Sequence, residues 1–576
     1  MKLKRVSERK TEVTLSLVAP RFKGNKNMAS SPLSLIYTLL ISLTYIHGKL
    51  LVHAVDYDFS YMKSVYNATD LPLVKQYDYI VIGGGTAGCP LAATLSEKYS
   101  VLVLERGNAP NAHPNVLVAS GFLANLIEND NGDTPAQRFK SEEGVENVRA
   151  RVLGGTSMIN GGFFSEADND FLANSGVEWD MGEVEKAYEW VKEKIVSHSN
   201  LSVWQSAVKE ALLEAGVGPD NGVTTKHKLG TKQSGSTFDD MGRRHGAVEL
   251  LNNGDLKNLV IAIQASVKKI IFSTKSSNPT AIGVIYTDTK GRSHKALLRN
   301  KGEVILSAGA LGSPQLLLLS GIGPQSYLSS QHIPIVLSQP NVGQFMADNP
   351  RNNINLIIPF PLETSIFQVV GVTNDYIIET FSYSLQFSPT ILPFSIYPNP
   401  IIPTKLILAT LAEKIVGPLS TGSLWLASNT NVTATPHVRF NYFSDPIDLA
   451  RCVSAMRKFG ELLKTKSLDR FKYKDLNGNR NFLFFGPPLP TIQSNDSSME
   501  DYCRSSITTF WHYHGGCLVG KVVDGDFMVI GTNSLRVVDG STFIISPGTN
   551  PQATLMMMGR YLGLKMLRER QTQITN

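Results

Sequence analysis

The chain has 576 residues, 42% of them apolar, and it carries a formal net charge of +6. The whole charge excess lies in residues 1–27, which hold eight Lys or Arg and two Asp or Glu, whereas the rest has 47 basic and 47 acidic residues. A chain of this length buries a large core in more than one folding unit. Its neutral body argues against nucleic acid as a partner, because phosphate binding needs a local basic excess.

Residues 1–54 are predicted to be a basic leader followed by a secretory signal peptide. Residues 28–48 contain no Lys, Arg, Asp or Glu, and an apolar stretch at 33–43 forms their centre. Small residues at Val52 and Ala54 permit cleavage after Ala54. An uncleaved anchor is the alternative, since about 20 apolar residues span a bilayer, but the interspersed Ser, Thr and Tyr favour the signal. We therefore expect secretion, to the extracellular space or the vacuole, without stable membrane insertion after cleavage.

Secretion would place the chain in an oxidising lumen that permits N-glycosylation and disulfide formation. Four acceptor sequons begin at Asn67, Asn200, Asn431 and Asn495. Four cysteines are too few for a disulfide-built scaffold or a Cys-rich zinc protein, and no metal site is predicted. Cys89 falls in a glycine-rich loop and Cys517 in a His-rich turn. The favoured bridge is therefore Cys452 with Cys503, although three full pairings and four free thiols stay open.

A nucleotide-binding βαβ unit is predicted between residues 77 and 107. The apolar run at 79–82 is typical of a buried parallel strand, 90–98 of a helix with Pro near its start, and 101–104 of the next strand. The intervening Gly-Gly-Gly-Thr-Ala-Gly therefore lies where the first strand turns into the helix.

The glycines of this turn each have a physical role. Gly83 permits the tight turn, Gly85 lets a pyrophosphate approach the backbone, and Gly88 lets helix and strand pack closely. Glu105 ends the second strand, 22 residues after Gly83, where a carboxylate accepts hydrogen bonds from ribose hydroxyls. FAD and NAD both fit this unit, whereas the acid argues against a 2'-phosphate.

A second glycine-rich loop follows at residues 151–166, and it is poor in charge. Such a loop can lie flat against a planar ring, with Asn160 free to hydrogen-bond it, although an ordinary tight turn is the alternative. Further on, 259–288 and 303–307 are predicted as strands, and a helix begins within 309–317. This repeated strand-to-helix turn indicates a return of the chain to the nucleotide-binding domain.

Residues 351–445 differ from the preceding segments in composition and pattern. They contain several prolines and many Ile, Phe, Thr and Tyr, and they show little helical periodicity. We interpret them as an antiparallel sheet that covers the cofactor and shapes a substrate pocket. An amphipathic helix is predicted at 447–465.

The C-terminal region carries the candidate chemistry. Residues 509–517 read Thr-Phe-Trp-His-Tyr-His-Gly-Gly-Cys, and Asn-Pro-Gln follows from Asn550, 38 residues after His512. A histidine near its ordinary pKa of about 6.5 is a suitable proton acceptor, and an amide can hold the oxygen that loses the proton.

Together these segments resemble the glucose-methanol-choline (GMC) family of FAD oxidoreductases, over essentially residues 75–570. The resemblance rests on the glycine fingerprint with Glu105-Arg106, on Gly-Gly-Thr-Ser at 154–157 with Asn160, on the 309–324 segment, and on the C-terminal motifs at 512–517, 538–541 and 550–551. Within the family, the sequence is similar to the plant branch that holds the mandelonitrile lyases and the HOTHEAD-like proteins.

The resemblance implies an α/β fold, α+β overall, in which a Rossmann-like FAD-binding domain is joined to a second, antiparallel-sheet substrate domain. The FAD-binding domain is predicted to be discontinuous, from 75–185, 250–350 and 500–570. The substrate domain is predicted to comprise 186–249 and 351–499. We expect a monomer.

The resemblance also implies a bound FAD, held covalently or noncovalently. The predicted cofactor-binding residues are Gly83, Gly85, Thr86, Ala87, Gly88, Glu105, Arg106, Val152, Thr156, Asn160, Gly161, Gly162, Phe163, Val267, Trp511, His512, Asp539, Gly540, Pro551 and Gln552. Among these, Val267 would meet the adenine through its backbone.

In the family pattern the catalytic histidine aligns with His512, which leaves His514 as a supporting residue, although spacing alone does not settle the choice. His512 and Asn550 are therefore the predicted catalytic residues of an alcohol oxidoreductase: His512 takes the hydroxyl proton, the hydride passes to flavin N5, and Asn550 steadies the developing alkoxide.

A cyanohydrin lyase of the (R)-mandelonitrile type is the alternative, and a flavin-binding protein with a structural or cuticle-related role is a second one. The lyases of this branch carry a second histidine where this chain has Asn550. They also carry a substrate-binding tyrosine where this chain has Phe510, which we expect to contact substrate. Both departures favour an alcohol over a cyanohydrin as the small-molecule substrate.

Overall fold

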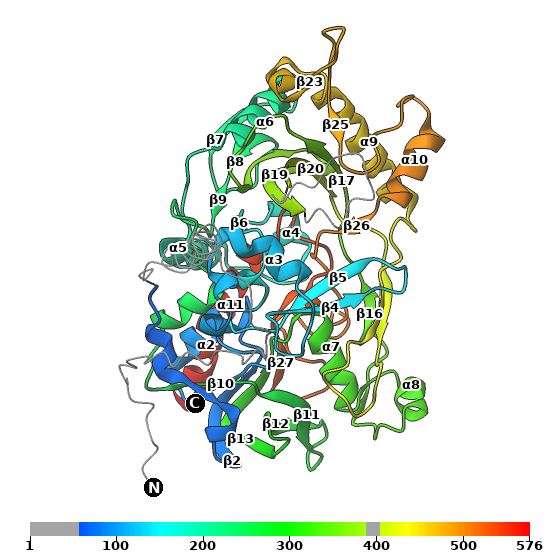
Figure 1. Cartoon of the computed structure of the whole chain (residues 1–576). Coiled ribbons are helices and arrows are strands. Elements are labelled where there is room, and N and C mark those ends of the chain that lie inside the picture. Colours follow the sequence, from blue (N-terminus) through cyan, green and yellow to red (C-terminus); the bar gives the residue numbers. More distant parts are fainter. Residues whose placement is uncertain (1–56, 388–403, 576) are drawn as a thin grey trace, which may run out of the picture. The chain divides into compact units, whose positions relative to one another are not determined.

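Two large β-sheets organise the computed structural model, which describes residues 57–387 and 404–575 (Figure 1). Residues 58–576 form one compact unit. The leader and signal peptide predicted at 1–54 lie outside the described residues. The boundaries predicted between the FAD-binding and substrate domains stay a prediction.

The first sheet is parallel at its centre. Strands β1, β10, β3, β2 and β13 are parallel neighbours in this order, β27 also pairs with β13, and β12 and β11 extend the sheet antiparallel. Their bounds are β1 Val65–Asn67, β2 Val74–Ile82, β3 Val101–Leu104, β10 Leu259–Ile263, β11 Ser266–Ser273, β12 Thr280–Thr287, β13 Ser293–Leu306 and β27 Leu535–Val537.

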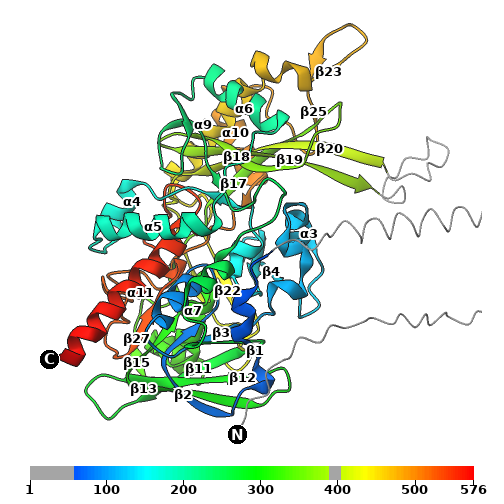
Figure 2. The ribbon, with the colours of Figure 1, turned by 90° about the vertical axis from the view of Figure 1, so that its left-hand side faces the viewer.

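The predicted βαβ unit is confirmed as part of this sheet. Strand β3 matches the predicted 101–104, and all four of its residues are buried, as expected for a central parallel strand. Helix α2 (Gly88–Ser96) begins two residues before the predicted helix. It packs along the C-terminal helix α11 (Gln552–Thr575), which also contacts α5 (Met181–Ile195). Figure 2 shows α11 as the long red helix.

The second sheet is antiparallel through its long strands, as predicted for 351–445. Its order is β25-β17-β20-β19-β18-β8-β7, with β26 paired to β17, and β7 runs parallel to β8. Their bounds are β7 Asp220–Val223, β8 Gly230–Gln233, β17 Pro350–Ile357, β18 Ser365–Val372, β19 Tyr376–Phe387, β20 Thr404–Ile415, β25 Leu483–Phe484 and β26 Thr508–Thr509.

Helices cover one face of the second sheet, as Figure 2 shows for α6, α9 and α10. The helices are α6 Val203–Glu214, α9 Pro446–Leu462 and α10 Asp496–Ser505. Because side chains alternate along a strand, Ile378 and Leu411 point to this side and join the apolar cluster beneath the helices. A disulfide between Cys452 and Cys503 ties α9 to α10, which is the favoured pairing, while Cys89 and Cys517 are free and buried.

Further helices and strands connect the two sheets' elements along the chain. The helices are α3 Phe122–Ile127, α4 Asn169–Asn174, α7 Gly309–Leu319 and α8 Gln325–Ser330, and the strands include β4 Ala136–Lys140, β5 Glu146–Ala150, β6 Phe163–Phe164, β9 Gly235–Ser236, β16 Gln344–Met346, β21 Gly422–Trp425 and β22 His437–Arg439. Across residues 57–387 and 404–575, no helix is both long and apolar enough to cross a membrane.

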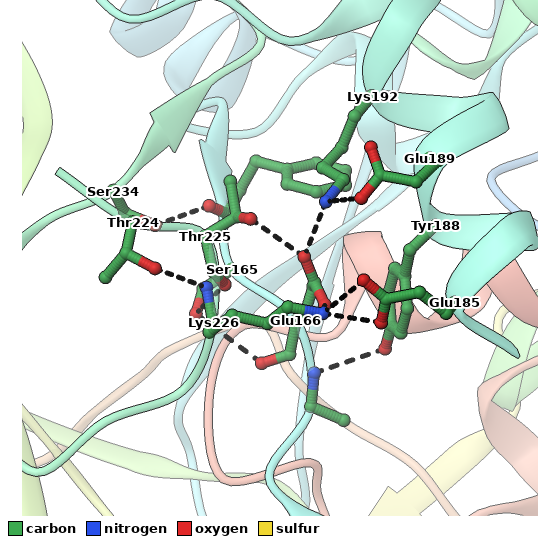
Figure 3. Close-up of polar contacts among 12 residues, drawn as sticks. Ser165, Glu166, Glu185, Tyr188, Glu189, Lys192, Thr224, Thr225, Lys226 and Ser234 are labelled. Carbon is green, nitrogen blue, oxygen red and sulfur yellow. Dashed lines mark hydrogen bonds and ion pairs between the residues drawn. The ribbon is translucent and has the colours of Figure 1, made fainter. Parts of the chain in front are cut away.

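A buried carboxylate, Glu166, anchors the segment that follows β6 (Figure 3). Its oxygens accept hydrogen bonds from Lys192 of α5 at 3.0 Å and from Thr225 at 2.8 Å, and it forms an ion pair with Lys226 at 2.8 Å. Burial alone would raise the pKa of Glu166, but the hydrogen bonds from Lys226, Thr225 and Lys192 lower it. Glu166 therefore fixes the chain just beyond the glycine-rich loop at 151–166.

We expect Glu166→Gln to lower the free energy of unfolding at pH 7 by about 2 kcal/mol, because it removes charged hydrogen bonds from a buried group. A lowered pKa means that this stabilisation is present above the unfolded value of about 4.3 and is lost as pH falls through the folded pKa. The difference from the wild type, measured by denaturant unfolding, should therefore shrink in acid.

Glu189→Gln is the matched control, because Glu189 pairs with the same Lys192 but is 51% exposed. An exposed pair contributes less than about 1 kcal/mol. Equal losses in the two variants, or a Glu166→Gln loss that does not change with pH, would contradict this account.

Candidate functional site

One deep cavity collects the predicted site residues. Its volume is about 260 Å³. Both predicted catalytic residues, His512 and Asn550, line it, as does Phe510. Every predicted cofactor-binding residue lines it too, except Gly88. The structure thus brings together residues from opposite ends of the sequence, while their individual roles stay predictions.

The glycine turn forms one wall of the cavity. Gly83 has a φ of +101°, and a Cβ there would lie 2.3 Å from the carbonyl oxygen of Ser307. A Cβ on Gly88 would lie 2.1 Å from the oxygen of Gly83, so Gly88 serves close packing rather than the cavity. Beside Gly85 the nearest heavy atom to such a Cβ is 3.8 Å away, in Gly155. The backbone at Gly85 is therefore open to a ligand.

Glu105 closes the cavity at the end of β3. Its Oε2 accepts a hydrogen bond from the Gly84 amide at 3.1 Å, and its Oε1 accepts one from the Gly107 amide at 2.7 Å. Burial raises the pKa of Glu105, and these backbone donors oppose the rise. Because a carboxylate has about four acceptor positions, each oxygen keeps one for a ligand hydroxyl.

Two arginines, the half-buried Arg106 and the buried Arg149, line the same cavity. Arg106 and Arg149 both donate to Oε1 of Gln137, at 2.6 and 2.9 Å. Nη2 of Arg149 is buried and has no partner among the described residues. Burial and then the charge of Arg106 lower the pKa of Arg149. Sequence reasoning missed Arg149 and Gln137, because they lie on the β4–β5 hairpin without a recognisable motif.

The loop beyond residue 159 is held by amide side chains. Nδ2 of Asn160 donates to Gln552 at 2.9 Å, and its Oδ1 accepts from Gly162 at 3.0 Å and from Arg244 at 2.9 Å. Nε2 of Gln552 donates to the Phe163 carbonyl at 2.6 Å. The Asn160 amide is thus largely engaged within the protein. Arg244, which is fully buried, was also missed, because nothing local in the sequence marks it.

His512 is positioned through its backbone. Its amide donates to Oδ1 of Asp348 at 3.0 Å, and Oδ2 of Asp348 accepts from Thr509 at 2.6 Å. Burial raises the pKa of Asp348 to about 6. Burial, followed by the charges of Lys414, His514 and Arg351, holds the pKa of His512 well below its ordinary value. His512 is therefore neutral at neutral pH, as a base must be.

The two predicted catalytic side chains, those of His512 and Asn550, each have a polar atom without a hydrogen-bond partner among the described residues. These atoms, Nδ1 of His512 and Oδ1 of Asn550, are buried. His514 does not line the cavity; its Nδ1 lies 3.0 Å from the His512 carbonyl oxygen, and burial lowers its pKa to about 4. The ring of Phe510 lies 5.0 Å from that of His512.

Comparison with known proteins agrees with this geometry. A family model described as GMC oxidoreductase matches residues 77–351, and a second one with that description matches 418–559. (R)-mandelonitrile lyase 1 of Prunus serotina is 53% identical over 95% of this chain and 96% of its own length. Sinalpyl alcohol oxidase Nec3 of Nesocodon mauritianus is 50% identical over 89% of this chain and 92% of its own. A structure of an Aspergillus oryzae formate oxidase variant, determined to study FAD modification, covers 87% of this chain and 100% of its own with a TM-score of 0.72 at 19% identity.

These findings establish the predicted fold class and FAD as the cofactor. The residues present fit this cofactor. The open backbone at Gly85 leaves room for a diphosphate, Glu105 keeps acceptor positions for ribose hydroxyls, and the unpartnered Nη2 of Arg149 needs an acceptor atom.

Gly85→Ala and Gly88→Ala should have opposite effects. The first adds a methyl group where only a ligand would meet it, so we expect FAD to bind about tenfold or more weakly while the fold keeps its stability. The second forces a clash with the Gly83 carbonyl, so we expect a loss of about 1–3 kcal/mol in the free energy of unfolding. Titration of the apoprotein with FAD and denaturant unfolding check the pair; weaker FAD binding only in Gly88→Ala would refute the assignment.

Proposed function

Because this chain belongs to the GMC oxidoreductase family, we propose that it is an FAD-dependent enzyme that oxidises the CH–OH group of an alcohol. The observation that carries the proposal is that a neutral, half-buried His512 and the amide of Asn550 line the same cavity. An amide does not exchange protons at neutral pH, so the pair supplies one base and one hydrogen-bond donor. Alcohol oxidation needs that combination.

The chain's own residues perform the proton chemistry. His512 accepts the hydroxyl proton on an imidazole nitrogen while the oxygen gains negative charge. Asn550 donates an N–H to that oxygen, which stabilises the developing charge. FAD bound in the cavity supplies flavin N5 as the acceptor of the hydride. Phe122, Phe163 and Phe367 line the cavity as well, so an aromatic or long-chain alcohol suits its apolar wall.

A cyanohydrin lyase is the second candidate, and the 53% identity to a Prunus serotina lyase favours it. Asn550 and Phe510 oppose it, because they replace a second acid-base group and a phenolic hydroxyl. The 50% identity to an alcohol oxidase supports the first candidate to a similar degree.

We also propose a secreted glycoprotein. The Cys452–Cys503 disulfide suits an oxidising compartment, and three of the sequon asparagines, Asn200, Asn431 and Asn495, are exposed. Asn67 is half-buried, and its Nδ2 donates to the side chain of Gln264, so we expect little or no glycan there.

The proposed activity predicts that a panel of aromatic and long-chain alcohols includes one that bleaches the flavin absorbance near about 450 nm in the absence of oxygen. Absence of bleaching by every alcohol would count against the proposal. Release of cyanide from mandelonitrile above the nonenzymatic rate would instead favour the lyase, and absence of both activities would favour a structural flavin-binding role.

His512→Ala should lower turnover by about 10²–10⁴-fold while FAD stays bound, as expected for loss of a general base. Because the pKa of His512 is lowered, the loss of wild-type kcat/KM that comes from protonation of the imidazole should occur only as pH drops well below about 6.5. His514→Ala is the matched control, and it should retain most of the turnover. An equal loss in both variants would show that the base is wrongly assigned.

A further inference from the structure

Three charged side chains occupy the face of the second sheet opposite to the helices. Arg351 of β17 and Ile377 of β19 both pair directly with Lys414 of β20. The side chains of Arg351, Ile377 and Lys414 therefore lie on one face of the sheet. Glu379 lies two residues beyond Ile377 and therefore shares this face. Glu379 and Lys414 are buried, at 0% and 2% exposure. Charged groups are rarely buried so deeply without a specific partner.

Lys414 holds the segment that ends in Asn550. Its ammonium donates to the carbonyl oxygen of Thr549, and it lies 3.4 Å from both Oγ of Ser546 and the carbonyl oxygen of Pro547. This lysine thus fixes the backbone immediately before Asn550. The position of the predicted catalytic amide therefore depends on the second sheet.

Glu379 lies on the same sheet face as Lys414, which contacts this segment at Thr549. The Asn550 amide lies close enough to lower the pKa of Glu379, as an N–H donor does, although neither carboxyl oxygen has a fully formed hydrogen bond among the described residues. Lys414 faces Glu379 from β20, Arg351 from β17, and apolar Val370 pairs with it from β18. Asn550 is thus an uncharged polar group within reach of this carboxyl.

We propose that Glu379 is a positioning residue that accepts one N–H of Asn550 and so turns the second N–H toward the substrate oxygen. An amide has a donor end and an acceptor end of the same shape. Without an acceptor on the sheet side, Asn550 could present its oxygen to the substrate. That oxygen would compete with His512 for the hydroxyl proton and leave the developing alkoxide without a donor. This role rests on the proposed alcohol oxidation.

Ionisation of Glu379 strengthens the acceptor. Burial raises its pKa, and the charges of Lys414 and Arg351 oppose that rise. The site should therefore contain a second acid group that titrates above the ordinary Glu value of about 4.3. Because the pKa of His512 is lowered and that of Glu379 is raised, the two side chains ionise in separate pH ranges.

Glu413 provides a matched control, and it lies in β20, the strand that also carries Lys414. It precedes Lys414, is equally buried at 0% exposure, and has no hydrogen bond to either carboxyl oxygen among the described residues. Because it pairs with Ile378, it points to the helix-covered face, away from Asn550. Glu413→Gln and Glu379→Gln thus neutralise similar carboxyls on opposite faces.

The experiment compares holoenzymes of the wild type, Glu379→Gln and Glu413→Gln with an alcohol found in the flavin-bleaching panel. We expect Glu379→Gln to lower kcat by about tenfold or more, with a smaller change in KM, because loss of a well-placed donor acts on the transition state. In the wild type, kcat should fall in two steps as pH decreases, and the upper step should be absent from Glu379→Gln, whereas any contribution from Asp348, whose pKa is also raised, should stay in every variant. Glu413→Gln should keep both steps.

Glu379→Asp is the second variant if Glu379→Gln does not fold. It keeps the charge on a shorter side chain, so the upper step should persist while kcat falls. Unchanged kcat and an unchanged pH profile in Glu379→Gln, or the same loss in Glu413→Gln, would overturn the proposal.

A second measurement separates this proposal from the proposed activity. If the wild type oxidises no alcohol, the activity fails, and melting temperatures of Glu379→Gln, Asn550→Ala and the double variant then test the contact alone. Shifts that do not add support the positioning of Asn550 by Glu379, whereas additive shifts overturn it.

Discussion

The cost of placing a charge away from water is the physical constraint on which the proposed site depends. His512 and Asn550, the proposed base and amide, are half-buried on the cavity wall, and Glu379 is fully buried. In such surroundings an imidazolium is disfavoured by lost hydration and by nearby cations, so His512 remains a free base at neutral pH. Once bound substrate and FAD displace water from the cavity, one N–H donor from Asn550 would be effective, because little solvent would compete for the substrate oxygen.

The second sheet has two unlike faces. On one side, apolar residues pack beneath three helices, two of which, α9 and α10, are tied by the disulfide. On the other, the charged groups of Arg351, Glu379 and Lys414 approach the cavity. Because side chains alternate along β19 and β20, each residue that packs beneath the helices is next to one that points toward the cavity. A shift of one of these strands by one residue would therefore turn its apolar side chains toward the cavity and its charged side chains toward the helices.

Much of the fold was predictable because its signals are local. The glycine turn, the buried strands around it and the segment at 509–517 carry their constraints in consecutive residues. Arg149, Arg244 and Lys414 were not predictable, because each acts through partners that are distant in sequence. Lys414 contacts Thr549, which lies 135 residues away. No periodicity or motif encodes such a contact; long-range packing creates it.

Helix α11 determines when the cavity can be completed during synthesis of the chain. The cavity is lined by residues from Ile82 to Leu555, and the first residue of α11, Gln552, joins the helix to the Phe163 loop. A growing polypeptide therefore lacks part of the cavity wall until nearly all of its length has been synthesised. Because domains fold as they emerge, the βαβ unit can form early, whereas a complete enclosure for FAD is a late event. Truncation near the C-terminus thus removes part of the enclosure as well as the proposed catalytic amide.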